Sequence, residues 1–172
     1  MQKLYSEIIG MPVLTEYSDR PSAFIQDIII DPENGSVLAF RVKRNHIIVP
    51  YDVESIGRAL IIADSNRILP IAEVLRVENV FNMNINIIGA RVITEKEKIE
   101  IGHVVDYEIN TTTMSLTKIH SAKTFLFFRF NDRIISYKNI VKINKHSILI
   151  KESLRKVTQI EKTVVPESAF AA

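Results

Sequence analysis

An internal repeat is the feature that most constrains the fold of this chain. Residues 8–16, IIGMPVLTE, recur as residues 87–95, IIGARVITE, at an offset of 79. That offset holds without a gap for about 30 positions, and residues 47–51 then align with residues 133–137 at an offset of 86. Two copies of one unit fill the chain. A unit of about 80 residues can close its own small core, whereas solenoid repeats must stack on their neighbours.

Short runs of Ile and Val, at residues 28–30, 47–49 and 148–150, predict strands in both copies. β-Branched side chains are stiff at χ1 and pack well on a pleated surface. Residues 31–35, DPENG, place Pro and Gly where a tight turn needs them, and residues 43–46 form a weaker turn signal. Short strands separated by tight turns predict a small all-β barrel or sandwich.

The second copy contains extra residues that predict a longer hairpin. The two offsets differ by 86 minus 79, or seven, residues, which fall between Met114 and Arg133. Residues 117–130 are therefore expected to form a longer excursion. We expect residues near Ile8 and Ile87 to begin equivalent strands, and the two copies to superpose by a pseudo-two-fold or screw operation.

Strand and turn residues of the first copy form a family pattern: Ile9-Gly10, Val13, residues 25–30, Asp31-Pro32-Glu33-Asn34-Gly35, Phe40-Arg41-Val42, Ile48-Val49-Pro50-Tyr51 and Val53. The second copy retains part of it: Ile88-Gly89, Val92, Asp106, Ile109, Ile134-Ile135 and Tyr137. In that copy residues 110–114 replace the Pro/Gly turn and Ser136 replaces the Pro. The pattern resembles the PRC-barrel domain over residues 4–62 and, more thinly, over residues 85–150. The resemblance implies a small β-barrel that acts as an interaction module, with no catalytic residues to carry over.

The expected architecture is therefore all-β, with two small PRC-barrel-like barrels in tandem. The first repeat is assigned to residues 1–80, the second to residues 81–155, and a C-terminal tail to residues 156–172. The connector, residues 63–86, fits a short helix or an extended strand equally well. Its apolar content indicates that the barrels pack together, because flexible linkers are rich in Gly and Ser.

Few residues suggest catalytic or metal chemistry. The chain has no Cys, its four His residues occur singly, and its five Gly residues are dispersed, so we expect no metal site and no cofactor. Asp27 and Asp106 stand at equivalent positions and form either a catalytic pair or two structural carboxylates that accept backbone N–H groups at a barrel rim. The structural interpretation is favoured because such groups are usually satisfied locally. We expect a protein that is not an enzyme.

Charge separates the two halves of the chain. Residues 1–80 carry 8 basic and 11 acidic side chains, net −3, while residues 81–172 carry 14 and 9, net +5. Residues 118–156 contain ten basic and two acidic residues, which gives a net charge of +8, and several Phe residues lie among them. Cations interleaved with aromatic rings suit single-stranded RNA or DNA. Alternatively, the Phe side chains fill the second barrel while Lys and Arg coat its wet face.

We expect a cytoplasmic adaptor that binds another protein, either one with an acidic surface or the acidic first barrel of a second copy. The expected contact residues are Lys123, Phe127, Phe128, Arg129 and Arg133. An apolar centre with a cationic rim is the composition of such an interface. Binding of RNA or a ribosome through the basic second barrel is the alternative. A membrane contact is the least favoured, because no amphipathic helix, lipid anchor or run of ~20 apolar residues is evident.

Overall fold

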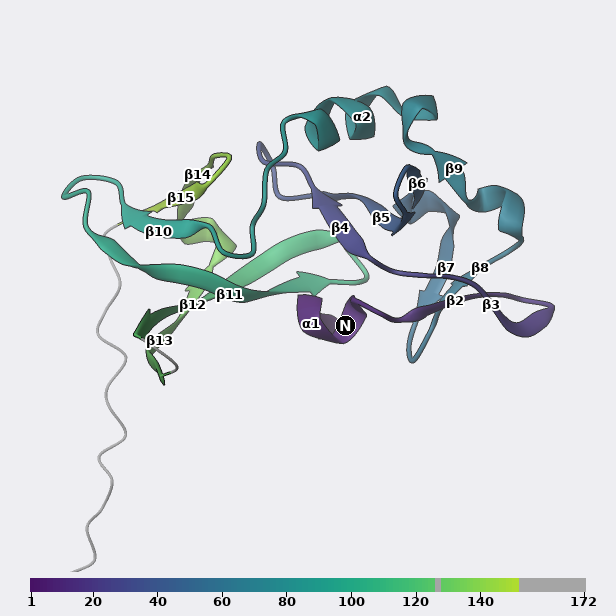
Figure 1. The fold of residues 1–172 in the computed structure, drawn as a ribbon, viewed down its shortest axis with the longest axis horizontal. Helices are drawn as coiled ribbons and strands as arrows, with labels where there is room; N and C mark the ends of the chain where they lie inside the picture. Colours follow the sequence, from purple (N-terminus) through teal and green to yellow (C-terminus); the bar gives the residue numbers. More distant parts are fainter. Residues whose placement is uncertain (126–127, 152–172) are drawn as a thin grey trace, which may run out of the picture.

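Strands arranged in three sheets dominate the structure, a computed structural model that describes residues 1–125 and 128–151 (Figure 1). The side chains of residues 124–131 lie outside that description. Two short α-helices, α1 (Tyr5–Ile8) and α2 (Leu75–Asn82), are present in the described residues. The predicted all-β class is confirmed at this level.

The first half of the chain forms two four-stranded sheets. One sheet has the order β3 (Ser18–Phe24), β2 (Pro12–Thr15), β8 (Leu60–Ile62) and β7 (Val53–Ile56). The other has the order β4 (Asp27–Ile30), β5 (Val37–Lys43), β6 (His46–Ile48) and β9 (Leu69–Pro70). Short 3₁₀ turns lie at Pro50–Asp52, Ser65–Arg67 and Ile71–Glu73.

The second half forms one larger sheet, which also takes in the N-terminal strand β1 (Gln2–Leu4). Its order is β13 (Phe128–Ser136), β12 (Ser115–Phe125), β11 (Glu100–Asn110), β10 (Arg91–Thr94), β15 (Ser147–Ile150) and β14 (Ile140–Ile143). A 3₁₀ turn at Tyr137–Asn139 joins β13 to β14. Strand β1 pairs with β11, so the first residues of the chain belong to the sheet of its second half.

The strand pairings of the first half recur in the second. The parallel pair β2–β8 has its counterpart in the parallel pair β10–β15, and the antiparallel hairpin β5–β6 has its counterpart in β12–β13. Strands β2 and β10 begin at Pro12 and Arg91, 79 residues apart. Equivalent strands therefore begin near Ile8 and Ile87 as expected, four residues after each of them. Ile8 ends α1, and each strand follows a glycine with positive φ, +82° at Gly10 and +79° at Gly89, which turns the chain first.

The longer excursion predicted for residues 117–130 is confirmed as an extended hairpin. The β5–β6 hairpin closes at the pair Lys43 and His46, whereas β12 and β13 continue to the pair Phe125 and Phe128. The seven additional residues therefore lengthen two paired strands at their tip. This hairpin lies away from the first half of the chain in Figure 1.

Helical structure fills most of the connector between the halves, which resolves the alternative left open by the sequence. Helix α2 covers β4 and β5, and its Val77 and Val80 pack with Ile29 of β4 in a separate small apolar cluster (Figure 1, top). Ile28 and Ile30 belong instead to the main core. Because side chains alternate along a strand, the run of three isoleucines is buried on both faces of the sheet.

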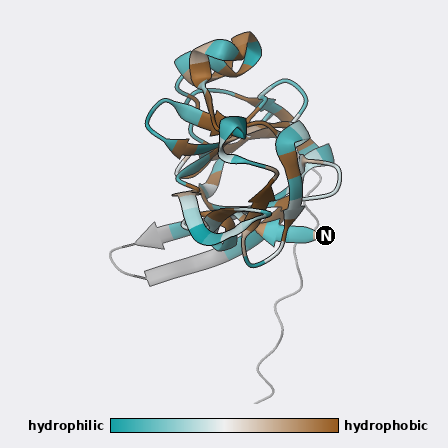
Figure 2. Cartoon of the chain, turned by 90° about the vertical axis from the view of Figure 1, so that its right-hand side faces the viewer, coloured by the Kyte–Doolittle hydropathy of each residue, from teal (hydrophilic) through white to brown (hydrophobic). Residues whose placement is uncertain are grey.

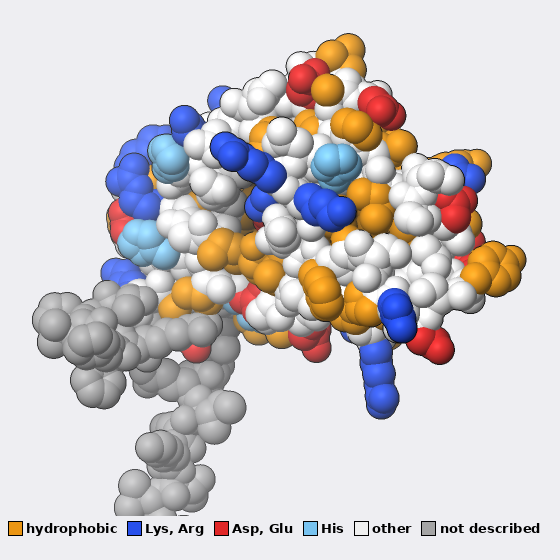
Figure 3. All heavy atoms as spheres, turned by 45° about the vertical axis from the view of Figure 1, so that its right-hand side comes forward, with side chains coloured by type: hydrophobic (Ala, Val, Ile, Leu, Met, Phe, Trp, Pro, Cys, Tyr) orange, Lys and Arg blue, Asp and Glu red, His pale blue; other side chains and the backbone are white. Residues whose placement is uncertain are grey.

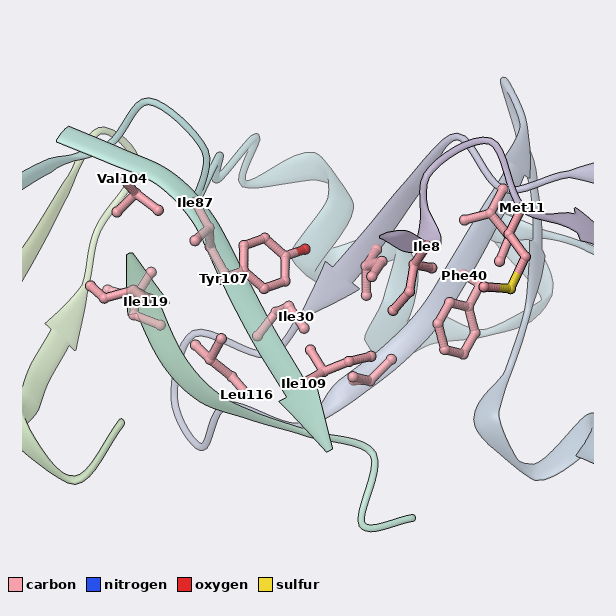
Figure 4. Packing of buried hydrophobic residues seen from close by; sticks show 14 of the residues in the cluster. Ile8, Met11, Ile30, Phe40, Ile87, Val104, Tyr107, Ile109, Leu116 and Ile119 are labelled. Carbon is pink, nitrogen blue, oxygen red and sulfur yellow. The ribbon is translucent and has the colours of Figure 1, made fainter. Parts of the chain in front are cut away.

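The main apolar cluster is continuous across both halves rather than divided into two cores. In Figure 4, Ile30 from the first half lies beside Tyr107 and Leu116 from the second. Figure 2, which views the molecule from the right-hand side of Figure 1, shows brown apolar stretches on the strands around the interior. The halves therefore pack as one unit, as the apolar connector predicted.

A short two-stranded contact joins equivalent turns of the two halves. Ser36 pairs with Ser115, which is 79 residues further on, in an antiparallel bridge. The Val37 N–H donates to the carbonyl of Met114 (2.8 Å), and the Leu116 N–H donates to that of Gly35 (2.8 Å). Val37 and Leu116 are equivalent residues, and so are Gly35 and Met114. Each of the two bonds is therefore the counterpart of the other, and the contact has local two-fold symmetry.

Candidate functional site

The structure places the sequence-predicted contact residues on the β12–β13 hairpin. Lys123 is exposed on β12, and Arg133 is half-buried on β13 opposite Ser121. Phe128 and Arg129 lie in β13 and pair through their backbones with Phe125 and Thr124, but their side chains lie outside the described residues. Phe127 lies outside the described residues altogether. The hairpin thus brings four of the five residues onto two adjacent strands.

Strand β13 is an edge strand. Among the described residues it pairs with β12 alone, which leaves alternate N–H and C=O groups of its other edge without a strand partner. Ile134, which was named only as part of the family pattern and not as a contact residue, is 58% exposed on β13 beside Arg133. A large apolar side chain on an open, cationic edge is a template for pairing with another chain.

An ion-paired cluster covers the outer face of β11 and β12 behind this edge. The Glu108 carboxylate accepts hydrogen bonds from Lys118 Nζ (2.8 Å) and, at its other oxygen, lies 2.8 Å from His120 Nε2. Burial raises the pKa of Glu108, but the bonds to Lys118 and His120 together outweigh burial and leave the pKa below its ordinary value. Lys118 is therefore already neutralised, although the sequence analysis counted it in the basic patch.

A second group of cations lies on and around the β14–β15 hairpin. Its exposed members are Lys138, Lys142, Lys145 and Lys151. None of the four forms an ion pair within the part of the chain that the structure describes. Figure 3 shows Lys, Arg and His side chains gathered on the left of that view. Within the described ranges, no carboxylate forms an ion pair that offsets the positive charge of these lysines.

A pocket of about 410 Å³ lies between the two halves, beneath the end of α2. Its walls come from β4, β11, α2 and residues 84–88. Arg41 contacts Asp27 through Nη2 and Gln26 through Nη1, each at 3.4 Å, while its Nε is buried and has no hydrogen-bond partner among the described residues. Arg41 was predicted only as a strand residue; the available signal for a further role was a single Arg within the apolar run 37–42.

Tyr5 closes one side of this pocket. Its hydroxyl donates to Asp27 (3.3 Å), and its ring lies 4.8 Å from the ring of Tyr107. Burial, and then the charge of Asp27, raise the pKa of Tyr5 to about 12. Neutral tyrosine and paired Arg41 and Asp27 give the pocket little net charge.

Asp27 and Asp106 have the structural role that was favoured for them. Each carboxylate accepts a hydrogen bond from the next backbone N–H, that of Ile28 (2.9 Å) and that of Tyr107 (2.8 Å). Asp106 also accepts from the backbone N–H and the hydroxyl of Ser6. The prediction that these carboxylates satisfy backbone groups at equivalent strand positions is confirmed.

Comparison with known protein families identifies part of the chain. A PRC-barrel domain is found at residues 1–69, which contain the first repeat's strands, turns and Pro/Gly hairpin. No curated protein matches the chain at a significant level. Within the described residues, none of the helices has the length and apolar character needed to cross a membrane.

Proposed function

We propose that the chain is a non-enzymatic adaptor built from two PRC-barrel-like units, residues 1–80 and 81–155, followed by a tail at residues 156–172. The family match at residues 1–69 supports the first unit. The recurring strand pairings, the equivalent positive-φ glycines and the symmetric contact at Ser36 and Ser115 support the second. A cytoplasmic location stays a prediction.

The proposed activity is binding of another protein through the β12–β13 hairpin. PRC-barrel domains are generally non-catalytic interaction modules, which favours binding over catalysis. The observation that carries the proposal is the open edge of β13, where exposed Ile134 follows Arg133. The partner presents an acidic surface, or is a second copy offering its acidic first half.

The hairpin supports such binding by three kinds of contact. A partner strand pairs with the outward N–H and C=O groups of β13. Ile134 supplies the apolar centre, and Lys123 and Arg133 contact acidic side chains at its rim. Charge complementarity speeds association and selects the partner more than it adds affinity.

A matched pair of double variants tests the proposal. Arg133→Glu with Ile134→Asp changes the β13 edge, and Val141→Asp with Lys142→Glu makes the same kinds of change on β14. We expect the β13 variant alone to lose the proteins that co-purify from the native cell, or the dimer seen by sedimentation velocity. Unchanged partners and sedimentation for a folded β13 variant would contradict the proposed site.

RNA binding is the second candidate function, favoured by the exposed lysines around β14 and β15 that lack ion pairs among the described residues. Phosphate contacts release counterions, so affinity must fall steeply as salt rises. Filter binding of a single-stranded oligonucleotide across a salt series measures this slope. A flat response, or equal binding by a variant carrying Lys142→Glu and Lys145→Glu, removes this candidate.

A further inference from the structure

The N-terminal strand covers a strand edge in the second half of the molecule. In β1, residues Gln2 to Leu4 pair antiparallel with Asn110 to Glu108 of β11. Subtracting the repeat offset of 79 places the equivalent edge at residues 29–31, at the end of β4. The equivalent of β1 would be residues 81–83, but these end helix α2 and form no strand. Among the described residues, β4 pairs with β5 only.

The pocket lies at this uncovered edge of β4. Its lining includes Ile28, Ile29 and Ile30, whose side chains alternate between the two faces of the sheet. A pocket that touches three consecutive strand residues must lie along the strand's edge rather than over one face. The opposite wall includes residues 84–88, and the N–H groups of residues 85–88 donate no hydrogen bond within the described chain.

Arg41 lines the pocket, and its charge is already offset there. Its two contacts, with Asp27 and Gln26 at 3.4 Å each, are longer than the usual range for N–H donors. Its Nε is buried, so the pocket meets the guanidinium through its other nitrogens. A carboxylate fits less well because Asp27 already lies against the same guanidinium.

We propose that this pocket binds an extended, uncharged segment of another protein, which adds to β4 as a strand in the way that β1 adds to β11. The isoleucine lining favours apolar side chains on the bound segment. Its backbone pairs with the free edge of β4. The volume of about 410 Å³ falls within the usual range for binding pockets, roughly 300–1,000 Å³. The site does not depend on the β12–β13 hairpin.

Blocked peptides of defined pattern test the mode of binding. The probes are fluorescent peptides in which Thr alternates with Val, Ile, Leu or Phe, and matched peptides N-methylated at alternate residues. We expect at least one unmethylated peptide to bind by anisotropy and to slow amide exchange in β4. Methylation at one set of alternate residues abolishes binding, and methylation at the other set is tolerated, because alternate N–H groups face β4.

A pair of Asn→Trp variants locates the site. Asn86 lines the pocket, whereas Asn82, equally exposed at the end of α2, does not. Asn86→Trp is expected to weaken peptide binding by about tenfold or more, while Asn82→Trp leaves it unchanged. The proposal is overturned if no peptide of the set binds at millimolar concentration, if both methylation patterns act alike, or if both variants act alike. If amide exchange in β4 slows as the protein concentration rises in the absence of peptide, the edge is instead covered by a second copy of the chain.

Discussion

The two halves of the molecule share their strand pairings but differ in what covers equivalent strands. Ile29 of β4 is buried beneath α2, whereas the equivalent residue of β11, Glu108, forms ion pairs with Lys118 and His120 of the neighbouring strand. The edge of β11 is covered by β1, while the equivalent edge of β4 borders a pocket. Equivalent strands of the two halves therefore present different surfaces, because different segments cover them.

The joint between the halves shows the same kind of asymmetry. Tyr137 packs on Gly35, and burial, followed by the charge of Asp31, raises the pKa of Tyr137. The equivalent tyrosine, Tyr51, is 93% exposed, and the residue equivalent to Gly35 is Met114, whose side chain packs against the core. Gly35 leaves space for the ring of Tyr137, whereas the side chain of Met114 leaves no equivalent space for the ring of Tyr51.

Substitution of Gly35 should have the largest effect on stability. A Cβ there would lie 2.6 Å from Cε2 and Cζ of Tyr137, and the residue has a φ of +74°. Backbone strain and overpacking together predict a loss of about 4 kcal/mol in the free energy of unfolding for Gly35→Ala. Urea denaturation measures it. Gly57→Ala, whose Cβ meets nothing within 4 Å, is the control, and equal small losses in both would disprove the close packing at the joint.

Truncation of the equivalent pair Ile29 and Glu108 should separate the covered face from the open one. Ile29→Ala removes a side chain that is 7% exposed beneath α2, so we expect a loss of about 3 kcal/mol. Glu108→Ala removes a carboxylate from ion pairs near the surface and should cost less than about 1 kcal/mol. Comparable losses in urea denaturation would mean that α2 does not cover β4.

The two tyrosines provide a smaller contrast. Tyr137→Ala exposes the joint and is expected to cost about 1.5 kcal/mol, whereas Tyr51→Ala should change stability by no more than about 0.5 kcal/mol. Thermal unfolding of the two variants against the wild type compares them directly. A larger loss for Tyr51→Ala would reverse the assignment of which half is packed at the joint.

Acid should reveal the ion pairs of the open face. Because the pKa of Glu108 is lower in the folded state than its ordinary value of 4.5, its contribution to stability is present above that value. It is lost as the pH falls through the lower, folded-state pKa. Glu108→Gln should therefore lose less stability than the wild type on acidification below about pH 4.5, in denaturation curves taken at several pH values. Identical slopes would show that Glu108 is not ion-paired in solution.

The sequence was sufficient to predict features that depend on local pattern or on the repeat. The longer β12–β13 hairpin follows from the difference between the two offsets. The repeat also places Gly10 and Gly89 at equivalent positions, but their shared positive φ is seen only in the structure. The sequence did not determine the conformation of the connector, because the spacing of its apolar residues fits a helix and a strand equally well. Only the three-dimensional structure, in which α2 buries Ile29, shows that this part of the connector is helical.

The candidate sites were predicted less well because they depend on contacts between distant segments. A strand pattern does not reveal which segment covers the strand's edge, so the pairing of β1 with β11 and the pocket beside β4 had no signal. Charge counting found the basic region but could not show that Glu108 neutralises Lys118. Ile134 was missed because a β-branched residue in a strand is usually buried.

Residue-resolved amide hydrogen exchange of the free protein tests the central comparison, that one strand edge is covered and its equivalent is open. The account predicts slow exchange for all of Glu108, Ile109 and Asn110, because β11 is paired on both sides there. In β4 it predicts slow exchange at the amides bonded to β5 and at Ile28, whose N–H donates to Asp27, and faster exchange at the remaining amides that face the pocket. Uniformly slow exchange along β4, matching β11, would show that its edge is already covered and would contradict the account.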